Sequence, residues 1–186
     1  AGMSKNSKAQ THHPTGSRTH GVGVLREERH DAYRPAGKPA EGTECPQCHA
    51  HVRRGAWRWT DMTPEAAPNA PVVPATAPVQ QRCPACERQR VHDPAAVLTL
   101  NGRYVAEQLE PLRALIRHEA QHESMEHPLE RIMAIEPLPG GGLMISTTGP
   151  HLAQAIAHAV QRAHKGELRI QHLQGEARMR VHWHRD

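Results

Sequence analysis

The chain has 186 residues, of which 37% are hydrophobic and none is Phe, so it can bury only a small core. Residues 1–39 carry the whole formal net charge of +4, because they hold seven Lys or Arg against three acidic residues while the rest of the chain is balanced. No run of 18 apolar residues occurs, and the first residues lack the pattern of a secretory signal. We therefore expect no membrane association and a cytoplasmic location.

Residues 1–40 are polar and contain several Pro and Gly, with no sustained hydrophobic period. This composition predicts a flexible, disordered tail. A basic tail suits a polyanion such as RNA, although a solvated tail that aids solubility has the same composition. The candidate RNA-binding residues of this segment are Lys5, Lys8, Arg18, Arg26, Arg29, Arg34 and Lys38.

Residues 41–95 contain all four cysteines, in the pairs Cys45-Pro-Gln-Cys48 and Cys83-Pro-Ala-Cys86. Two residues between paired thiols let both sulfurs reach one ion, and two such pairs complete a tetrahedral site. The spacing predicts a zinc ribbon with one structural Zn²⁺. Four thiolate ligands would fill its coordination sphere, so we do not expect this zinc to be catalytic. A redox pair or free thiols are the alternatives.

The segment between the two cysteine pairs raises three further points. His49 and His51 follow the first pair directly and could replace a Cys ligand. The Pro/Ala-rich stretch 63–79 predicts an extended loop. Interleaved Arg and Trp side chains could bind phosphates and stack on bases, or one Trp could pack inside the ribbon. We favour a mixture, with one Trp packed and the Arg side chains pointing outward. These candidate RNA-binding residues are Arg53, Arg54, Trp57, Arg58 and Trp59.

Residues 96–128 are expected to form a helical linker, with a helix over 103–127. Val105, Leu109, Leu112 and Ile116 lie on one face of that helix, and charged residues fill the other. Pro111 is unfavourable inside a helix, so the helix either kinks there or begins near it.

Residues 129–186 predict a small ββαββ domain and hence an α+β chain. Segments 129–138 and 143–148 read as strands joined by a Pro-Gly-Gly-Gly turn. A helix follows from Pro150 and ends at Gly166. Segments 167–173 and 177–185 provide two more strands.

The last strand alternates between apolar residues on one side and Arg or His on the other. Arg178 and Arg180 share the polar side, and Arg169 on the preceding strand can join them. This pattern predicts either a basic RNA-binding sheet face or an ordinary solvated face.

His118-Glu119-Ala120-Gln121-His122 matches the H-E-x-x-H motif of metallohydrolases, in which the histidines bind a metal and the Glu acts as a base. The chain contains 16 His, so a chance match to this motif is a serious alternative explanation. The flanking residues are typical of a solvated helix face. We keep a metal-dependent hydrolase as an alternative function.

The two cysteine pairs, Arg-Gly-Ala-Trp-Arg-Trp, His127-Pro-Leu-Glu-Arg-Ile132, Thr147-Thr148 and His151-Leu-Ala form an ordered set over residues 30–185. The set resembles a family of short bacterial zinc-ribbon proteins, similar in ribbon character to the adaptor that exports the large ribosomal subunit in archaea and eukaryotes. The resemblance implies that the four cysteines bind metal and that His127, Arg131 and His151 occupy motif positions without an assigned role. The residue after the first cysteine pair departs from the family, which has Gly where this chain has His49.

The resemblance further implies a ribosome-associated role in stressed cells. Together with the basic tail, it favours a non-enzymatic zinc protein that binds RNA, expected to be ribosomal, and that needs no small-molecule substrate. A hydrolase and a protein–protein regulator whose ribbon only folds the chain remain the alternatives.

Overall fold

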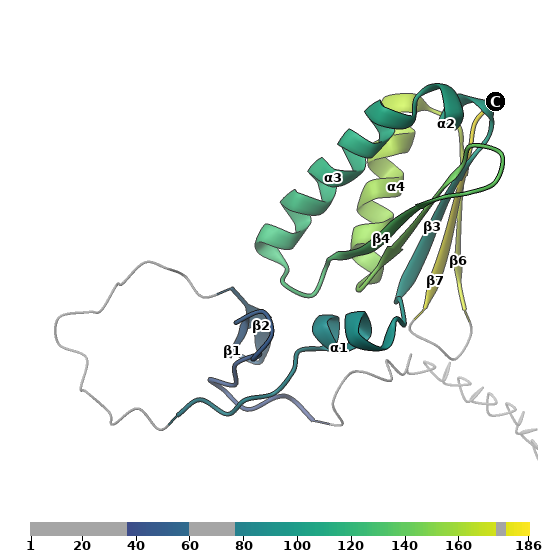
Figure 1. Cartoon of the computed structure of the whole chain (residues 1–186). Helices are drawn as coiled ribbons and strands as arrows, with labels where there is room; N and C mark the ends of the chain where they lie inside the picture. Colours follow the sequence, from purple (N-terminus) through teal and green to yellow (C-terminus); the bar gives the residue numbers. More distant parts are fainter. Residues whose placement is uncertain (1–36, 60–76, 174–177) are drawn as a thin grey trace, which may run out of the picture.

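The computed structural model describes residues 37–59, 77–173 and 178–186, which form a cysteine-containing ribbon and an α/β domain (Figure 1). Residues 1–36 of the predicted tail 1–40, with six of its candidate RNA-binding residues, lie outside the described residues, as do residues 63–76 of the Pro/Ala-rich stretch 63–79. No helix of the described part is long and apolar enough to cross a membrane.

The ribbon is built on a short antiparallel hairpin of β1 (His51–Arg53) and β2 (Ala56–Arg58). Arg54 and Gly55 form the turn, and both have positive φ, of 53° and 73°. Two consecutive residues of this conformation match the twist of a two-residue hairpin. Two isolated bridges join Glu44 to His51 and to Gln80, and they bring the segment after residue 77 alongside the hairpin.

The second cysteine pair begins helix α1 (Pro84–Val91). The Cys83 side chain accepts a hydrogen bond from the Cys86 N–H, and Pro84 takes the first helical position, where no N–H is needed. The helix ends at His92 in the left-handed conformation. A helix at this pair was not among the sequence-based expectations.

The α/β domain contains one five-stranded sheet in the order β4-β5-β3-β7-β6. Its strands are β3 (Ala96–Asn101), β4 (Ile132–Pro137), β5 (Leu143–Thr147), β6 (Glu167–His172) and β7 (Met179–His184). The central strand β3 pairs antiparallel with β5 and parallel with β7. The outer pairs, β4 with β5 and β6 with β7, are antiparallel.

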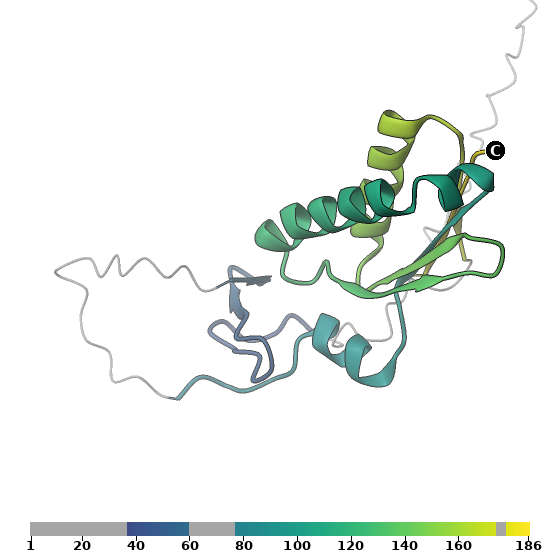
Figure 2. The same ribbon diagram turned by 45° about the horizontal axis from the view of Figure 1, so that its top comes forward.

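Three helices, α2 (Arg103–Glu107), α3 (Leu109–Glu126) and α4 (Pro150–His164), accompany the sheet. Helices α3 and α4 pack together on the same face of the sheet, and the ribbon lies at the end where α3 leads into β4 (Figures 1 and 2). The core between these layers combines Leu112 and Ile116 of α3 with Leu98, Ile145 and Trp183 of the sheet, all fully buried.

A carboxylate distant in sequence caps the N-terminus of α4. Glu130 is only 8% exposed, and its Oε2 accepts a hydrogen bond from the Leu152 N–H at 2.9 Å. Gly149 is required beside it, because a Cβ there would lie 2.2 Å from both carboxylate oxygens. The threonines before the helix bond other groups: the Thr147 hydroxyl donates to the Gly149 carbonyl, and the Thr148 hydroxyl to the Leu129 carbonyl.

The expectation of a mixed α/β fold with clustered cysteines is confirmed, but the sheet differs from a ββαββ unit. All four expected strands form, and a fifth, β3, lies at the centre of the sheet between β5 and β7. Segment 96–128, expected to be only a helical linker, supplies this strand as well as α2 and α3. Its helix is interrupted at Gln108, and Pro111 lies in the first turn of α3, where a missing N–H costs nothing.

Candidate metal centre and RNA-binding surfaces

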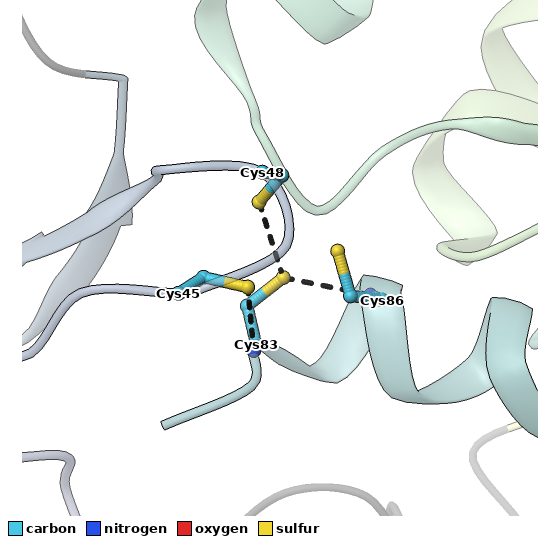
Figure 3. Close-up of side chains that lie close together, drawn as sticks. All are labelled: Cys45, Cys48, Cys83 and Cys86. Atoms are coloured by element: carbon cyan, nitrogen blue, oxygen red, sulfur yellow. Dashed lines mark hydrogen bonds between the residues drawn. The ribbon is translucent and has the colours of Figure 1, made fainter. Parts of the chain in front are cut away.

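The four cysteines converge on one point between the ribbon hairpin and α1 (Figure 3). Their Sγ atoms all lie within 4.8 Å of one another, and the four thiols are free of disulfides. Cys45, Cys83 and Cys86 are buried, while Cys48 is half-buried. The prediction that both pairs form a single site is confirmed.

The spacing of the sulfur atoms suits a tetrahedral metal ion. A tetrahedron with metal–sulfur bonds of about 2.3 Å has sulfur–sulfur edges of about 3.8 Å, and the Cys48 and Cys83 Sγ atoms lie 3.7 Å apart. Among the described residues this is the one group of Cys, His, Asp or Glu with ligand atoms gathered closely enough to hold an ion. His49 and His51, the alternative ligands, are not part of it.

The first cysteine pair is shaped by a tight turn that ends at His49. The His49 N–H donates to the Cys45 carbonyl at 2.9 Å, and His49 has a positive φ of 61°. Left-handed backbone favours glycine, which the resembled family has at this position. The His49 Nδ1 lies 3.0 Å from the carboxylate of Glu44.

Two of the sulfur atoms accept hydrogen bonds from backbone N–H groups. The Cys83 N–H donates to the Cys45 Sγ at 3.3 Å, and the Cys86 N–H to the Cys83 Sγ at 3.5 Å. Burial opposes ionisation of Cys45, but the N–H donors of Cys83, Cys48 and Gln47 outweigh it and lower the pKa of that thiol from 9.0 to about 6.

The other two buried thiols resist ionisation. Burial raises the pKa of Cys83 far above its ordinary value, and neighbouring thiolates raise it further. Burial also raises the pKa of Cys86, although Arg131 opposes that rise. Both shifts disfavour the thiolate form of Cys83 and Cys86, and a bound metal ion would favour that form through its positive charge.

Arg131, from the loop before β4, reaches the cluster from the α/β domain. Its Nη2 donates to the Cys48 Sγ at 3.1 Å and lies 3.9 Å from the Cys83 Sγ. Its Nη1 donates to the Cys86 Sγ at 3.4 Å. Burial disfavours the charged guanidinium, but these thiolates outweigh burial and raise the pKa of Arg131 above its ordinary value.

Both ribbon tryptophans, predicted as RNA contacts, are half-buried and contact the protein itself. The Trp59 Nε1 donates to the Ser124 carbonyl of α3 at 2.5 Å, and the Arg131 guanidinium lies 5.2 Å from the centre of the Trp59 ring. Trp57 packs against the buried cysteines and lines the wall of a cleft. Trp59 therefore helps to attach the ribbon to the α/β domain.

That cleft lies between the ribbon and the α/β domain and has a volume of about 1060 Å³. Its charged and histidine side chains come from both modules: Lys38 from the ribbon side, Glu123 and His127 from the end of α3, Glu130 from the loop after it, and His151 from the start of α4. Glu130 is committed to capping α4. Two of the motif positions without an assigned role, His127 and His151, are therefore cleft residues.

The arginines predicted on the ribbon hairpin all point outward. Arg53, Arg54 and Arg58 are exposed, and no ion pair forms at these side chains within the described part of the chain. The arginines on and beside α1 differ: Arg82 and Arg90 both contact Glu87, and these bonds lower the pKa of that carboxyl from 4.5 to about 2.

The three arginines predicted on the sheet lie on the face opposite the helices. Arg169 of β6 lies directly opposite His182 of β7, and Arg180 lies on β7 two residues before His182. Arg178 is paired with Asp93 at 2.9 Å, and Arg169 lies 3.6 Å from Glu167. A shallow pocket of about 250 Å³ lies between the two strands, lined by Glu167, Arg169, His182 and His184.

The H-E-x-x-H motif lies on α3, where His118 and His122 are exposed. Neither histidine belongs to the one metal-ligand group found among the described residues. The His118 Nδ1 is 3.9 Å from the Glu119 carboxylate. The two histidines of the motif therefore lie on the surface of α3, while Ala120 packs against the core.

Comparisons with family models, curated proteins and solved structures find no match for this chain. The family resemblance described above thus rests on its ordered motifs alone.

Proposed function

We propose that the chain is a non-enzymatic, zinc-stabilised protein that binds RNA. Zn²⁺ is proposed for the metal because four thiolates in closed tetrahedral geometry are its characteristic donor set in structural sites. A site with four protein ligands leaves no position for water or substrate, so the ion would hold the ribbon together. The cysteine geometry supports this part of the proposal.

RNA binding is supported chiefly by the ribbon hairpin. Arg53, Arg54 and Arg58 place three exposed guanidinium groups within a hairpin of eight residues, without an acidic partner in the described part of the chain. The hairpin differs in this from the nearby arginines Arg82 and Arg90, which both contact the carboxylate of Glu87. Unpaired guanidinium groups are suited to binding phosphates.

The open sheet face supplies a second candidate contact. Arg180 and His182 alternate along β7 and are exposed, and Thr99 of β3 lies beside His182 in the sheet. Single-stranded RNA is commonly bound on an open sheet, where phosphates meet Arg and bases stack on flat side chains. Because Arg169 and Arg178 are partnered by acids, we expect this face to contribute less than the hairpin.

Fluorescence anisotropy with a labelled single-stranded RNA, titrated at increasing KCl concentrations, tests the proposal. Each phosphate contact on a single strand contributes about 0.7 to the slope of log K against log salt. Changing Arg53, Arg54 and Arg58 to Gln should therefore reduce the slope by about 2. A matched control changes Arg103, Arg117 and Arg162, on the helical side, to Gln, and its slope should equal that of the wild type. Equal slopes for both triple variants would exclude the hairpin as the interface.

The resemblance extends the proposal to ribosomal RNA in stressed cells. Sedimentation of lysates from oxygen-starved cells through sucrose gradients at low and high salt separates this role from general RNA binding. Co-migration with ribosomal particles that high salt removes is expected. A protein that stays at the top of the gradient at both salt concentrations would instead favour a partner other than the ribosome.

A further inference from the structure

We infer that Arg131 is the charge partner of the metal centre, and that it couples metal binding in the ribbon to docking of the ribbon on the α/β domain. The inference rests on the proposed metal binding by the four cysteines, and not on RNA binding. Arg131 belongs to the α/β domain, yet its guanidinium donates to Cys48 and Cys86 and approaches Cys83.

The first argument is charge. Four thiolates around a divalent ion carry a net charge of about −2, and three of the four cysteines are buried. Buried charge is costly unless a partner compensates it. Arg131 is itself half-buried and supplies one positive charge at hydrogen-bond distance from two sulfurs. The metal-loaded cluster is therefore stabilised by a residue of the other module.

The second argument is that bonds within the α/β domain hold Arg131 in position. Its Nε donates to the Pro128 carbonyl at 2.6 Å, and its backbone N–H donates to the Thr148 hydroxyl at 2.9 Å. Its backbone carbonyl accepts the Thr148 N–H at 2.9 Å. These bonds belong to the α/β domain, so the guanidinium is presented to the ribbon as part of a rigid loop.

The third argument is that the ribbon contacts the guanidinium on two sides. The sulfurs accept its hydrogen bonds, and the Trp59 ring lies 5.2 Å away, within the range of a cation–π interaction. Trp59 also bonds to α3 through the Ser124 carbonyl. A neutral thiol is a much weaker acceptor than a metal-bound thiolate. Loss of the metal should therefore weaken the docking, and loss of Arg131 should weaken metal binding by the same coupling.

Metal affinity tests one direction of this coupling, with the full chain, Zn²⁺ and a competing chelator. Arg131→Met keeps most of the side-chain volume but removes the charge, and we expect its Zn²⁺ affinity to fall by about 10- to 100-fold. Arg131→Lys keeps the charge without the forked geometry and should lose less. Arg117→Met, at an exposed position on α3, is the control and should match the wild type. The Co²⁺-substituted protein should show a shifted thiolate-to-metal absorption band in Arg131→Met and not in Arg117→Met.

Hydrogen exchange tests the other direction. Removing the metal from the wild type should speed exchange of the Trp59 indole N–H, which bonds the ribbon to the Ser124 carbonyl of α3, while the amides of β3 keep their protection. Wild-type Zn²⁺ affinity in Arg131→Met, or unchanged exchange after metal removal, would overturn the coupling. Should Arg131→Met fail to fold by circular dichroism, wild-type affinity and an unshifted Co²⁺ band in Arg131→Lys would overturn it. A wild-type chain that binds no stoichiometric Zn²⁺ would instead overturn the metal proposal itself.

Discussion

The N-terminus of α4 leaves no space for a side chain at position 149, which makes Gly149→Ala a sharp test of the Glu130 cap. The added Cβ would lie 2.2 Å from both carboxylate oxygens of Glu130. Gly149 has an extended backbone (φ −137°, ψ 148°) that alanine adopts without strain, so the contact alone causes the cost. The carboxylate must move away and lose its bond to the Leu152 N–H. We expect a loss of about 2–4 kcal/mol in the free energy of unfolding, from a lost charged hydrogen bond and local overpacking.

Urea unfolding of the metal-loaded protein, followed by the helical signal in far-UV circular dichroism, measures this loss. Gly37→Ala is the control, because nothing lies within 4 Å of a Cβ there, and it should change stability by less than about 0.5 kcal/mol. The double variant decides the mechanism. Glu130→Ala removes the carboxylate, so adding Gly149→Ala in that background should cost less than about 1 kcal/mol. Equal costs of Gly149→Ala in both backgrounds would refute the proposed contact.

Two further predictions concern buried groups of the α/β domain. Burial raises the pKa of Glu130 above its ordinary value of 4.5, so the folded state holds this proton more tightly than the unfolded state does. The stability that this group contributes is fully present below pH 4.5 and is lost as the pH rises through the raised pKa of the folded state. The free energy of unfolding of the wild type, relative to that of Glu130→Gln, should therefore increase as the pH is lowered. Parallel pH profiles of the two proteins would contradict this. Trp183 is fully buried and its Nε1 donates to the Lys165 carbonyl at 2.7 Å. Trp183→Phe leaves that carbonyl without this donor and should cost about 1–3 kcal/mol in urea unfolding, whereas a cost near zero would show that the bond contributes nothing.

The features that the sequence predicted well are those fixed by local spacing. Two residues between paired cysteines determine how close two sulfurs can come, so the convergence of Cys45, Cys48, Cys83 and Cys86 followed from the pattern. The hydrophobic period after Pro150 similarly predicted α4, because one apolar stripe must face a core. The last strand alternates clearly between apolar and polar residues, and it forms as β7.

The central strand β3 shows where local patterns were insufficient. Ala96, Leu98 and Leu100 are buried and alternate with less buried residues, so a strand signal is present in the sequence. The segment is only six residues long and lies beside a longer helical pattern, which dominated the interpretation. Its central place follows from pairing with β5 and β7, and such long-range register is not encoded in any local window.

Arg131 could not have been placed at the metal centre from the sequence. Its neighbours carry no metal-binding spacing, and 45 residues separate it from Cys86 in the chain. The contact arises because the loop before β4 and the ribbon meet at one end of the α/β domain. The family resemblance marked its position without a role, and the role emerges only from the packing of the two modules.

The pairing of β3 has a consequence for the order in which the chain can fold. Ala96 lies opposite Met179 in a parallel pair, so one edge of the central strand stays open until the β6–β7 hairpin has been synthesised. During that interval β3 can pair only with β5, and its other edge presents unpaired N–H and carbonyl groups beside buried apolar residues. Pairing with β5 thus covers only one edge of β3, and the other edge is covered only when β7 pairs with β3 and completes the sheet.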